Sequence, residues 1–511
     1  MAAPGVMCTC RTCSKARVTL ERIFNVLDTY GWLLDSYVVD FFQEQLWKRL
    51  PNSWRTTLQT VSPDEFGKWL AGDISCSRVW PLSLLTLRQV AKNLQLNRDY
   101  QNDENVWRCN GRKKTENSLE NFVLECKNEG LHDSQKKHNL FLKHVKIKKR
   151  HEIQQIARVC AECAQESNAE CIIDVGAGVG HLARSLAFKY DLHVICIEQE
   201  ALLSQQARKW DKELLVSLSK YLPDLPVNMP QHISIKLENT DSDLSETIKD
   251  IRRTFSDNFN LNKKKSGFGI VGLHPCGDLA AMLLRLYTSQ CETRFICIVG
   301  CCYMKLTLKN PADVSNGYPL SKYLSSFTKH ELSYTALEVA CHAIESYCDK
   351  LKTGNYEDLI VHAYRAALET ILIKQNSHLR HTQVRNVKVT RPITFEQLSK
   401  IMIIEILCII SDNQIIFFRY CMAATADFEP NLRPKDSDLQ NPQIKCYLNQ
   451  WRQIVIFGAL RTMIAPLVET VVLLDRFLYL SENNLIPILK PVFNPRLSPR
   501  NFLLLSMKNT K

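Results

Sequence analysis

The feature that most constrains this chain is a run of three alternating glycines that directly follows a short apolar segment. Residues 171–175 read CIIDV, and Asp174 then opens the pattern D-x-G-x-G-x-G. Glycines at such a turn permit positive φ and let the backbone approach a ligand closely. The helical pattern HLARSLAFKY comes next. A strand, a glycine-rich turn and a helix in this order predict a ligand-binding turn.

The acid ahead of the glycines separates two cofactor classes. A nicotinamide dinucleotide fingerprint has the spacing G-x-G-x-x-G and no acid just before it, and Asp174 would repel a pyrophosphate. An acid suits a cofactor with a cationic amino-acid end and no phosphate, which describes S-adenosyl-L-methionine. Glu198 ends the next strand pattern, 24 residues after Asp174, and is placed to bind ribose hydroxyls. We therefore predict that the cofactor is held by Asp174, Gly176, Gly178, Gly180 and Glu198. The alternative is a tight turn beside a surface acid.

Short β-rich segments alternate with helical ones from Cys171 onward. This alternation predicts an α/β fold, in which a parallel sheet has helices on both faces. The expected order along the chain is a flexible tail over 1–17, an N-terminal helical domain over 18–96, a polar loop insertion over 97–135, the α/β core over 136–333, a large helical insertion over 334–480, and a C-terminal hairpin completing the core sheet over 481–511.

Two further motifs lie at the ends of predicted strands. In GLHPCGDL, His274, Cys276 and Asp278 follow the fourth strand, where the loop is expected to face the transferred methyl group. His274 is a candidate base or a packed histidine, and Cys276 is a nucleophile only if its thiolate is stabilised. In GCCYMKL, Tyr303 either stacks on a planar substrate or closes the core. These four residues are the predicted catalytic set.

The chain has 20 cysteines and no apolar leader at its start, which favours reduced thiols in the cytosol or nucleus. Cysteines and histidines near the two strand ends raise the question of zinc, but they lack C-x2-C pair spacing. Cys8, Cys10 and Cys13 make three ligands without an obvious fourth. The sequence alone therefore predicts no metal.

The net charge of +12 is concentrated in two acid-free segments. Residues 134–151 hold seven Lys or Arg, and residues 370–395 hold five, which together equal the whole excess. Such concentration favours a polyanion, and we predict RNA contacts through 136–151 and 374–391. The alternative is two solvated basic faces. Lys148, Lys149 and His151, at the end of the first segment, are the predicted substrate-binding residues. The oligomeric state is not predicted.

The most apolar tract, Ile454–Leu480, is long enough to cross a membrane. Arg461, Glu469 and other charges interrupt it, and a central charge costs about 2.5–3.5 kcal/mol in a bilayer. Pro466 lies midway. We predict a buried helix or helix pair, kinked at Pro466, and no membrane span.

Several segments together resemble the methyltransferase-like protein 25 family. They are KKRHEI at 148–153, DVGAGVGHL, GLHPCGDL, GCCYMKL and the C-terminal APLVETVVLLDR…LSPRNF. LDSYVVDFFQEQLW and LPNSW resemble its B branch, whose members carry the label of a ribosomal RNA adenine dimethylase domain. The resemblance implies a class I, Rossmann-like, seven-stranded S-adenosyl-L-methionine-dependent methyltransferase core. It also implies that the 148–153 motif lines the active site.

One departure from the dimethylases affects the expected substrate. True ribosomal RNA adenine dimethylases carry N-[IL]-P-[YF] after the fourth strand, where the polar residue and the aromatic hold a flipped base. This chain has Leu273-His274-Pro275-Cys276, without the Asn and the aromatic. The expected function is a methyltransferase with RNA as substrate. The alternatives are a non-catalytic scaffold or interaction protein that binds the cofactor, and a protein methyltransferase.

Overall fold

The computed structural model describes residues 7–73, 78–102, 104–111, 143–221, 228–237, 246, 248, 267–308, 316–387 and 412–508. Its contacts divide the chain into two compact units. The first unit comprises residues 1–28, 94–341 and 467–511, and the second comprises residues 29–93 and 342–466. Helix α1 (Arg11–Asp35) and helix α20 (Trp451–Glu482) each contribute residues to both units.

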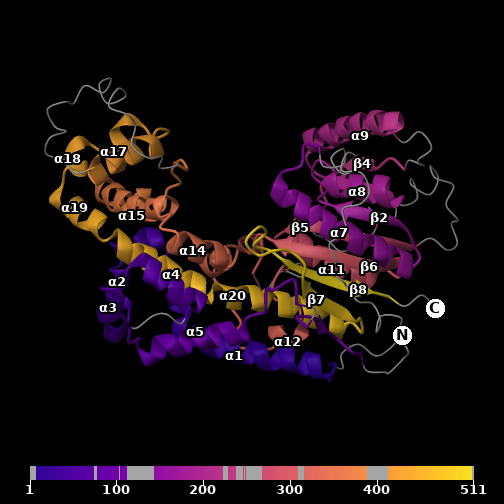
Figure 1. The fold of residues 1–511 in the computed structure, drawn as a ribbon, viewed down its shortest axis with the longest axis horizontal. Coiled ribbons are helices and arrows are strands. Elements are labelled where there is room, and N and C mark those ends of the chain that lie inside the picture. The colour runs from indigo at the N-terminus through magenta and orange to yellow at the C-terminus, as the bar shows by residue number, and fades with distance from the viewer. Residues whose placement is uncertain are drawn as a thin grey trace. The chain divides into compact units, whose positions relative to one another are not determined.

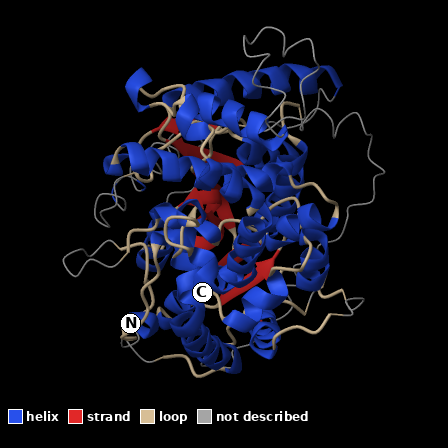
Figure 2. Ribbon diagram, turned by 90° about the vertical axis from the view of Figure 1, so that its left-hand side faces the viewer, coloured by secondary structure: helices blue, strands red, loops and turns tan. Residues whose placement is uncertain are grey.

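The first unit is built on one eight-stranded sheet in the order β1-β7-β8-β6-β5-β2-β3-β4. The strands from β6 through β5, β2 and β3 to β4 pair in parallel, whereas β8 joins β6, and β7 joins β8, in antiparallel fashion. Figures 1 and 2 show helices covering this sheet. The strands are β1 (Trp107–Arg108), β2 (Ala169–Val175), β3 (His193–Glu198), β4 (Gln231–Ser234), β5 (Gly267–Cys276), β6 (Thr293–Cys301), β7 (Pro487–Pro491) and β8 (Phe502–Met507).

Seven of these strands, from β7 to β4, form the class I methyltransferase sheet, so the predicted α/β fold class is confirmed. β5, β6 and β8 are buried along almost their whole length, which explains why their sequences are continuous apolar runs. The helices of this unit include α7 (Ile147–Glu166), α8 (His181–Tyr190), α9 (Ala201–Tyr221), α11 (Asp278–Ser289), α12 (Lys322–Ser325) and α13 (Tyr334–Val339).

Two of the expected segment boundaries differ from the structure. The predicted tail over 1–17 contains the first turns of α1, which begins at Arg11. The predicted polar loop over 97–135 contains β1, which pairs with β7 through Trp107 and Leu489. A two-residue strand leaves no periodicity to read, which is why the sequence did not predict it. Most of that polar segment, 112–135, lies outside the described residues.

The second unit is helical and unites two segments that the sequence predicts as separate domains. Helix α4 comes from the N-terminal segment and packs against α14 from the later segment. The apolar faces of the two segments therefore share one core, and the expected division is corrected. The helices are α2 (Leu46–Arg49), α3 (Asn52–Leu58), α4 (Pro63–Ala71), α5 (Leu82–Leu94), α14 (Ile344–Lys352), α15 (Glu357–Gln375), α17 (Asp412–Ala424), α18 (Asp436–Leu439) and α19 (Pro442–Asn449).

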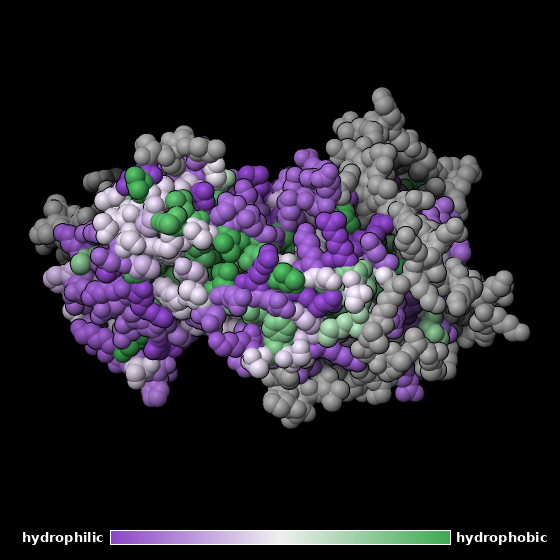
Figure 3. Space-filling view, turned by 90° about the horizontal axis from the view of Figure 1, so that it is seen from below, coloured by the Kyte–Doolittle hydropathy of each residue, from purple (hydrophilic) through white to green (hydrophobic). Residues whose placement is uncertain are grey.

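Helix α20 is long and apolar enough to cross a membrane, but 94 % of its most apolar window is buried inside the protein. Two of its charged side chains, Arg461 and Asp475, have hydrogen-bond partners in the protein. Arg461 donates to the carbonyls of Leu33 and Leu34, and Asp475 accepts from Ser321. Pro466 lies within the continuous helix. The face in Figure 3 shows hydrophobic patches, in green, separated by hydrophilic residues, in purple. The burial of α20 and the partners of Arg461 and Asp475 support the predicted buried helix.

Candidate active site

The glycine-rich turn joins β2 to α8, and its backbone is tied to the end of β3. The amides of Gly176 and Ala177 donate to the carbonyl of Ile197, and the amide of Gly178 donates to Oε2 of Glu198 at 2.8 Å. The other oxygen of Glu198 accepts from the amide of Glu200 at 3.1 Å. The turn after β2 and the acid at the end of β3 thus lie together, as predicted. Each carboxylate oxygen of Glu198 keeps a lone pair that can accept a hydrogen bond from a ribose hydroxyl.

Asp174 lies under this turn, with 2 % of its surface exposed. Burial raises the pKa of this carboxyl to about 7, against the attraction of Lys149 and with the repulsion of Glu198. A buried carboxylate that is this costly to ionise favours a cationic neighbour. The ammonium and sulfonium groups of S-adenosyl-L-methionine are such neighbours.

Two of the predicted glycines have different tasks. A Cβ on Gly178, where φ is +57°, would meet no atom within 4 Å, so the turn is open to a ligand at this point. A Cβ on Gly180 would lie 2.8 Å from the His232 ring. Gly180 therefore also serves packing at the start of α8, and its predicted role as a cofactor contact stays a prediction.

A buried ionic network fixes the turn from below. Arg184 donates to the carbonyl of Val179 and to Asp211, both at 2.5 Å, and Asp211 also lies 2.6 Å from Nε2 of His232. Arg184 and Asp211 come from α8 and α9, so both helices hold the turn in shape. Burial of a fully paired arginine is consistent with a preorganised binding loop.

The next part of the site is a carboxylate and an imidazole from different elements. Nε2 of His274, near the end of β5, lies 3.0 Å from Oε2 of Glu152 in α7. Glu152 is buried, and its other oxygen accepts from the hydroxyl of Ser498 at 2.7 Å. Burial raises the pKa of Glu152, but His274, Lys149 and Ser498 outweigh burial and lower it to about 2.

His274 itself is disposed as a neutral base. Burial lowers its pKa below the ordinary value, and the attraction of Glu152 opposes that shift only in part. Its Nδ1 is buried and makes no hydrogen bond within the described part of the chain. With Nε2 facing Glu152, Nδ1 is the nitrogen left to accept a proton.

The ends of β5 and β6 are both in strained conformations. His274 has a φ of 71° and Cys302 a φ of 52°, and the pairing of β5 with β6 shifts register between Leu273 and Cys276. Left-handed φ is costly for residues with a side chain, and such positions cluster at functional sites. The register shift is what turns His274 toward Glu152 rather than along the regular strand.

Three thiols meet where these strands end. The Sγ atom of Cys276 lies 3.3 Å from that of Cys301 and 3.4 Å from that of Cys302. Hydrogen bonds from Cys301 and Cys302, together with the charge of Lys305, outweigh burial and lower the pKa of Cys276 to about 5. Cys276 is exposed, so its predicted stabilised thiolate has a physical basis here.

Asp278 is bound by the segment that follows β6. Its Oδ1 accepts from the amide of Thr307 at 2.8 Å, and its Oδ2 accepts from the Thr307 hydroxyl at 2.5 Å. Both oxygens hold the chain that follows β6 against the start of α11. The prediction of Asp278 as a catalytic residue is corrected to a positioning role in the loop.

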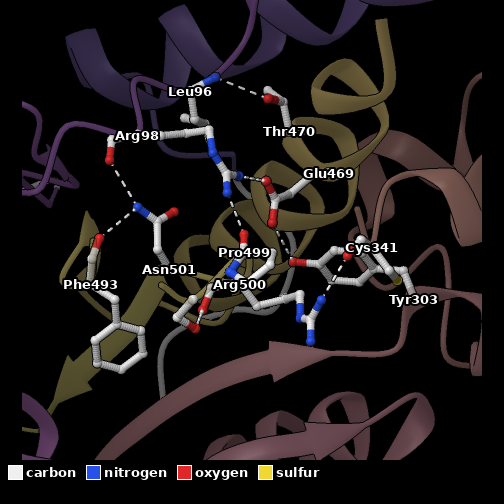
Figure 4. Close-up of polar contacts among 11 residues, drawn as sticks. Leu96, Arg98, Tyr303, Cys341, Glu469, Thr470, Phe493, Pro499, Arg500 and Asn501 are labelled. Atoms are coloured by element: carbon white, nitrogen blue, oxygen red, sulfur yellow. Dashed lines mark hydrogen bonds and ion pairs between the residues drawn. The ribbon is translucent and has the colours of Figure 1, made fainter. Parts of the chain in front are cut away.

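Tyr303 closes the core beneath the site. It is 1 % exposed and donates its hydroxyl to Glu469 at 3.1 Å, and Glu469 also pairs with Arg98 (Figure 4). Burial raises the pKa of Tyr303 well above the ordinary value. A substrate cannot stack on a ring that has no exposed face, so the prediction that Tyr303 acts on substrate is wrong. The alternative, that Tyr303 closes the core, is confirmed.

The loop between β7 and β8 completes the site. Arg98 donates to the carbonyl of Pro499, Arg500 donates to the carbonyl of Cys341 at 2.6 Å, and Asn501 joins Arg98 to Phe493 through two carbonyls (Figure 4). These contacts fix the segment that contains Ser498, whose hydroxyl donates to Glu152. The SPRN motif therefore positions a residue of the site rather than forming only a surface turn.

The three predicted substrate-binding residues on α7 have different surroundings. Lys148 is exposed, whereas Lys149 lies 3.2 Å from Glu152 and offsets its charge. His151 accepts from the amide of Asn494 at 3.1 Å and packs edge-on against Phe493. Burial lowers the pKa of His151, so it is a neutral packing residue. Its predicted substrate role is corrected.

Several residues at the centre of the site are not indicated by the sequence as site residues. Glu152 entered only as part of a motif, and Ser498, Cys301 and Cys302 were not predicted as site residues. The spacing of Lys148 and Glu152, one turn apart, could have shown that both lie on one face of α7. No local pattern indicates that Ser498 reaches Glu152, which lies 346 residues away.

Comparison with protein families matches residues 148–309 to a family described as "Methyltransferase domain". These residues form a methyltransferase domain. The domain contains every element of the site except the β7–β8 loop. Its cofactor is S-adenosyl-L-methionine, as predicted, and Asp174, the open backbone at Gly178 and Glu198 fit the cationic end and the ribose of that molecule.

The chain is homologous to methyltransferase-like protein 25. It is 23 % identical to the probable methyltransferase-like protein 25 of Mus musculus over 71 % of this chain and 75 % of that protein. It is 27 % identical to the probable methyltransferase-like protein 25 of Homo sapiens over 52 % of this chain and 39 % of that protein. The long alignment with the mouse protein shows that the similarity extends beyond the methyltransferase domain.

Among solved structures, the chain is similar to magnesium protoporphyrin IX methyltransferase from Synechocystis PCC 6803 with bound S-adenosyl-L-methionine. The identity is 15 %, and the match covers 37 % of this chain and 79 % of that chain with a TM-score of 0.21. A similarity this low does not indicate the substrate of the methyltransferase domain.

Two of the three cations that the structure describes in the second basic segment are paired with acids, whereas Lys374 is exposed. Arg380 lies 3.2 Å from Asp40 and 2.7 Å from Glu44, and Arg385 pairs with Asp427 through both carboxylate oxygens. These acids are distant in sequence, so a local charge count could not reveal them. The predicted RNA contact is corrected for these two arginines. Lys136, Lys137, Lys388 and Arg391 lie outside the described residues.

Proposed function

We propose that this methyltransferase acts on RNA, with its phosphates bound by lysines that flank the site. The observation that carries the proposal is the placement of two exposed lysines on elements of the site itself. Lys148 lies one turn before Glu152 on α7, and Lys305 follows β6, close enough to Cys276 to lower the pKa of its thiol. Cations on both sides of a reacting centre suit a polyanionic chain that passes across it.

A second basic surface supports the same substrate. A hollow of about 680 Å³ is lined by Lys143, Gln205, Arg208, Lys209, Lys212, Glu213 and Val216. Four of these side chains are cationic and one is acidic. Glu213 lies 3.7 Å from Lys143 and offsets its charge, which leaves the charges of Arg208, Lys209 and Lys212 in excess. Such a surface on α9 extends the binding region along the methyltransferase domain.

Methyl transfer divides the tasks among the residues of the site. The bound cofactor supplies the methyl group as an electrophile on sulfur. The chain must align the attacking atom and remove its proton. Nδ1 of His274 accepts that proton, and the carboxylate of Glu152 stabilises the resulting imidazolium from the Nε2 side. Ser498 and Lys149 hold Glu152 ionised in its buried position.

Placement in the B branch of the methyltransferase-like protein 25 family is part of this proposal. It is supported by LDSYVVDFFQEQLW and LPNSW near the N-terminus. The adenine-binding motif of true dimethylases is absent from the β5 end, where Cys276 stands in place of the aromatic. The proposal is therefore restricted to RNA as a class. The many free cysteines support a reducing compartment, cytoplasm or nucleus.

A transfer assay tests the proposal. The full chain is incubated with S-adenosyl-L-methionine labelled in the methyl group and with RNA and protein fractions of a cell extract. We expect label in RNA, lost in the His274→Ala variant and retained in His378→Ala, whose histidine is exposed and distant in sequence. Label in protein would make a protein methyltransferase the correct reading. Cofactor binding without transfer to any fraction would favour the non-catalytic scaffold.

A further inference from the structure

Four cysteine thiols meet at the edge of the sheet, outside the site described above. Cys8, Cys10 and Cys13 come from the start of the chain and the first turn of α1, and Cys109 follows β1 directly. Their Sγ atoms all lie within 4.8 Å of one another. Cys109 is the fourth candidate ligand. The sequence did not indicate it, because it lies 96 residues from Cys13.

The spacing of the thiols is that of a tetrahedral metal site. The Sγ atom of Cys109 lies 3.7 Å from that of Cys8, 3.9 Å from that of Cys10 and 3.6 Å from that of Cys13. Zinc bonds to thiolates at about 2.3 Å, so the edge of a tetrahedral four-thiolate site measures roughly 3.8 Å. The three measured separations bracket this value.

Other uses of four thiols fit less well. A disulfide places its sulfurs at about 2.05 Å, and all four cysteines are free thiols. An iron–sulfur cluster has several irons and sulfide ions between its cysteines and would hold the thiols farther apart. A purely apolar cluster has no reason to gather four sulfurs within 4.8 Å of one another. Thiolates without other donors select zinc among the common metals of a reducing compartment.

The surroundings of the thiols provide the hydrogen bonds that a structural site needs. The amide of Cys13 donates to Sγ of Cys10 at 3.5 Å. The hydroxyl of Ser481, near the end of α20, lies 3.2 Å from Sγ of Cys13 and 3.6 Å from Sγ of Cys109. Such outer contacts orient ligands and offset the negative charge of a four-thiolate site.

Backbone and helix contacts fix the segment that carries the first three thiols. Arg17 donates to the carbonyl of Cys8 at 2.9 Å. The start of α1, which is the positive end of the helix dipole, lies between Cys10 and Cys13. On the other side, the amide of Cys109 donates to the carbonyl of Pro487 in β7 at 3.0 Å. Both halves of the cluster are thus positioned without the metal.

We propose that Cys8, Cys10, Cys13 and Cys109 bind one structural zinc ion that ties the start of α1 to the β1–β7 edge of the sheet. The ion closes a loop of about a hundred residues and secures a strand of two residues, which is too short to be stable by pairing alone. Binding replaces four thiol protons by one Zn²⁺, so the protons go to solvent and no electron transfer is required.

Metal analysis of the purified full chain, expressed with zinc in the medium, tests the proposal. We expect about one zinc per chain. Cys109→Ser and Cys13→Ser should each lose most of it, and Cys446→Ser, which removes an exposed cysteine elsewhere, should retain it. Because Cys10 is part-exposed, Cys10→His should keep the ion and Cys10→Val should lose it. That difference separates ligation from folding.

Two further measurements exclude alternatives. Cobalt substituted for zinc should give the visible absorption of a tetrahedral thiolate site, absent in Cys109→Ser. Removal of zinc by a chelator should lower the melting temperature by about 5 °C or more. A wild-type chain without metal would overturn the proposal. So would an intact mass lower by two hydrogens for each disulfide, because the cysteines would then be oxidised. Zinc that is retained by both serine variants but lost in Cys301→Ser would also overturn it.

Discussion

Oε2 of Glu152 in α7 lies 3.0 Å from Nε2 of His274 at the register shift of β5. This contact joins the helix that precedes β2 to a strand in the centre of the sheet. It places a carboxylate and an imidazole at the carboxyl edge of the sheet, where β5 also ends in the exposed thiol of Cys276. In open α/β sheets, ligands bind at this edge.

The charge of Glu152 should make the fold sensitive to acid. Its pKa is about 2 in the folded protein against an ordinary 4.5, so its stabilisation is present above pH 4.5 and is lost as the pH falls toward 2. Between pH 6 and pH 3 the wild type should lose about 2 kcal/mol more unfolding free energy than Glu152→Gln. Denaturant unfolding measures this, with Glu429→Gln, an exposed acid, as control. Equal acid sensitivity of wild type and Glu152→Gln would refute the assignment.

Asp174 should make cofactor affinity depend on pH near neutrality. Burial raises its pKa to about 7, and the ionised form is the one that attracts a cationic ligand. Binding should therefore strengthen about tenfold between pH 6 and pH 8, and the dependence should flatten in Asp174→Asn. Calorimetric titration of both proteins at the two pH values gives the comparison. The same slope in both would show that the cofactor's own amino group is titrating.

Cys276 should react as a thiolate at unusually low pH. Hydrogen bonds from Cys301 and Cys302 lower its pKa to about 5, against the opposing effect of burial. Its alkylation rate should reach a plateau above about pH 6, and Cys301→Ala should slow it at that pH. Site-resolved mass spectrometry measures the rate, with the exposed Cys446 in the same digest as internal reference. A rate still rising steeply at pH 8 would contradict the thiol cluster.

The flanking lysines should contribute to the salt dependence of RNA binding. Each phosphate contact with a single strand contributes about 0.7 to the slope of log affinity against log salt. Lys148→Gln with Lys305→Gln should flatten the slope by about 1.4 and leave cofactor affinity unchanged. The matched control replaces Arg380 and Arg385, which are paired with acids. If both double variants keep the wild-type slope, the lysines do not bind phosphate.

Local patterns predict the parts of this protein that depend on neighbouring residues. The turn at Gly178, the acid at Glu198 and the alternation of strands and helices follow from spacing and strand context. The Glu152 contact depends instead on a register shift 122 positions along the chain. The pairing of Arg380 with Asp40 and the meeting of Cys13 with Cys109 likewise join segments that are far apart in the sequence. A single sequence contains no signal for such pairs.

Direct titration of S-adenosyl-L-methionine into a glycine variant is the most decisive test of the central claim, that the turn at Gly178 cradles the cofactor. A Cβ at Gly178 or at Gly354 meets no atom within 4 Å, and φ is positive at both, so the two positions carry matched strain. Calorimetry should detect binding by the wild type and Gly354→Arg, and none by folded Gly178→Arg. Wild-type affinity in a folded Gly178→Arg protein would contradict the account.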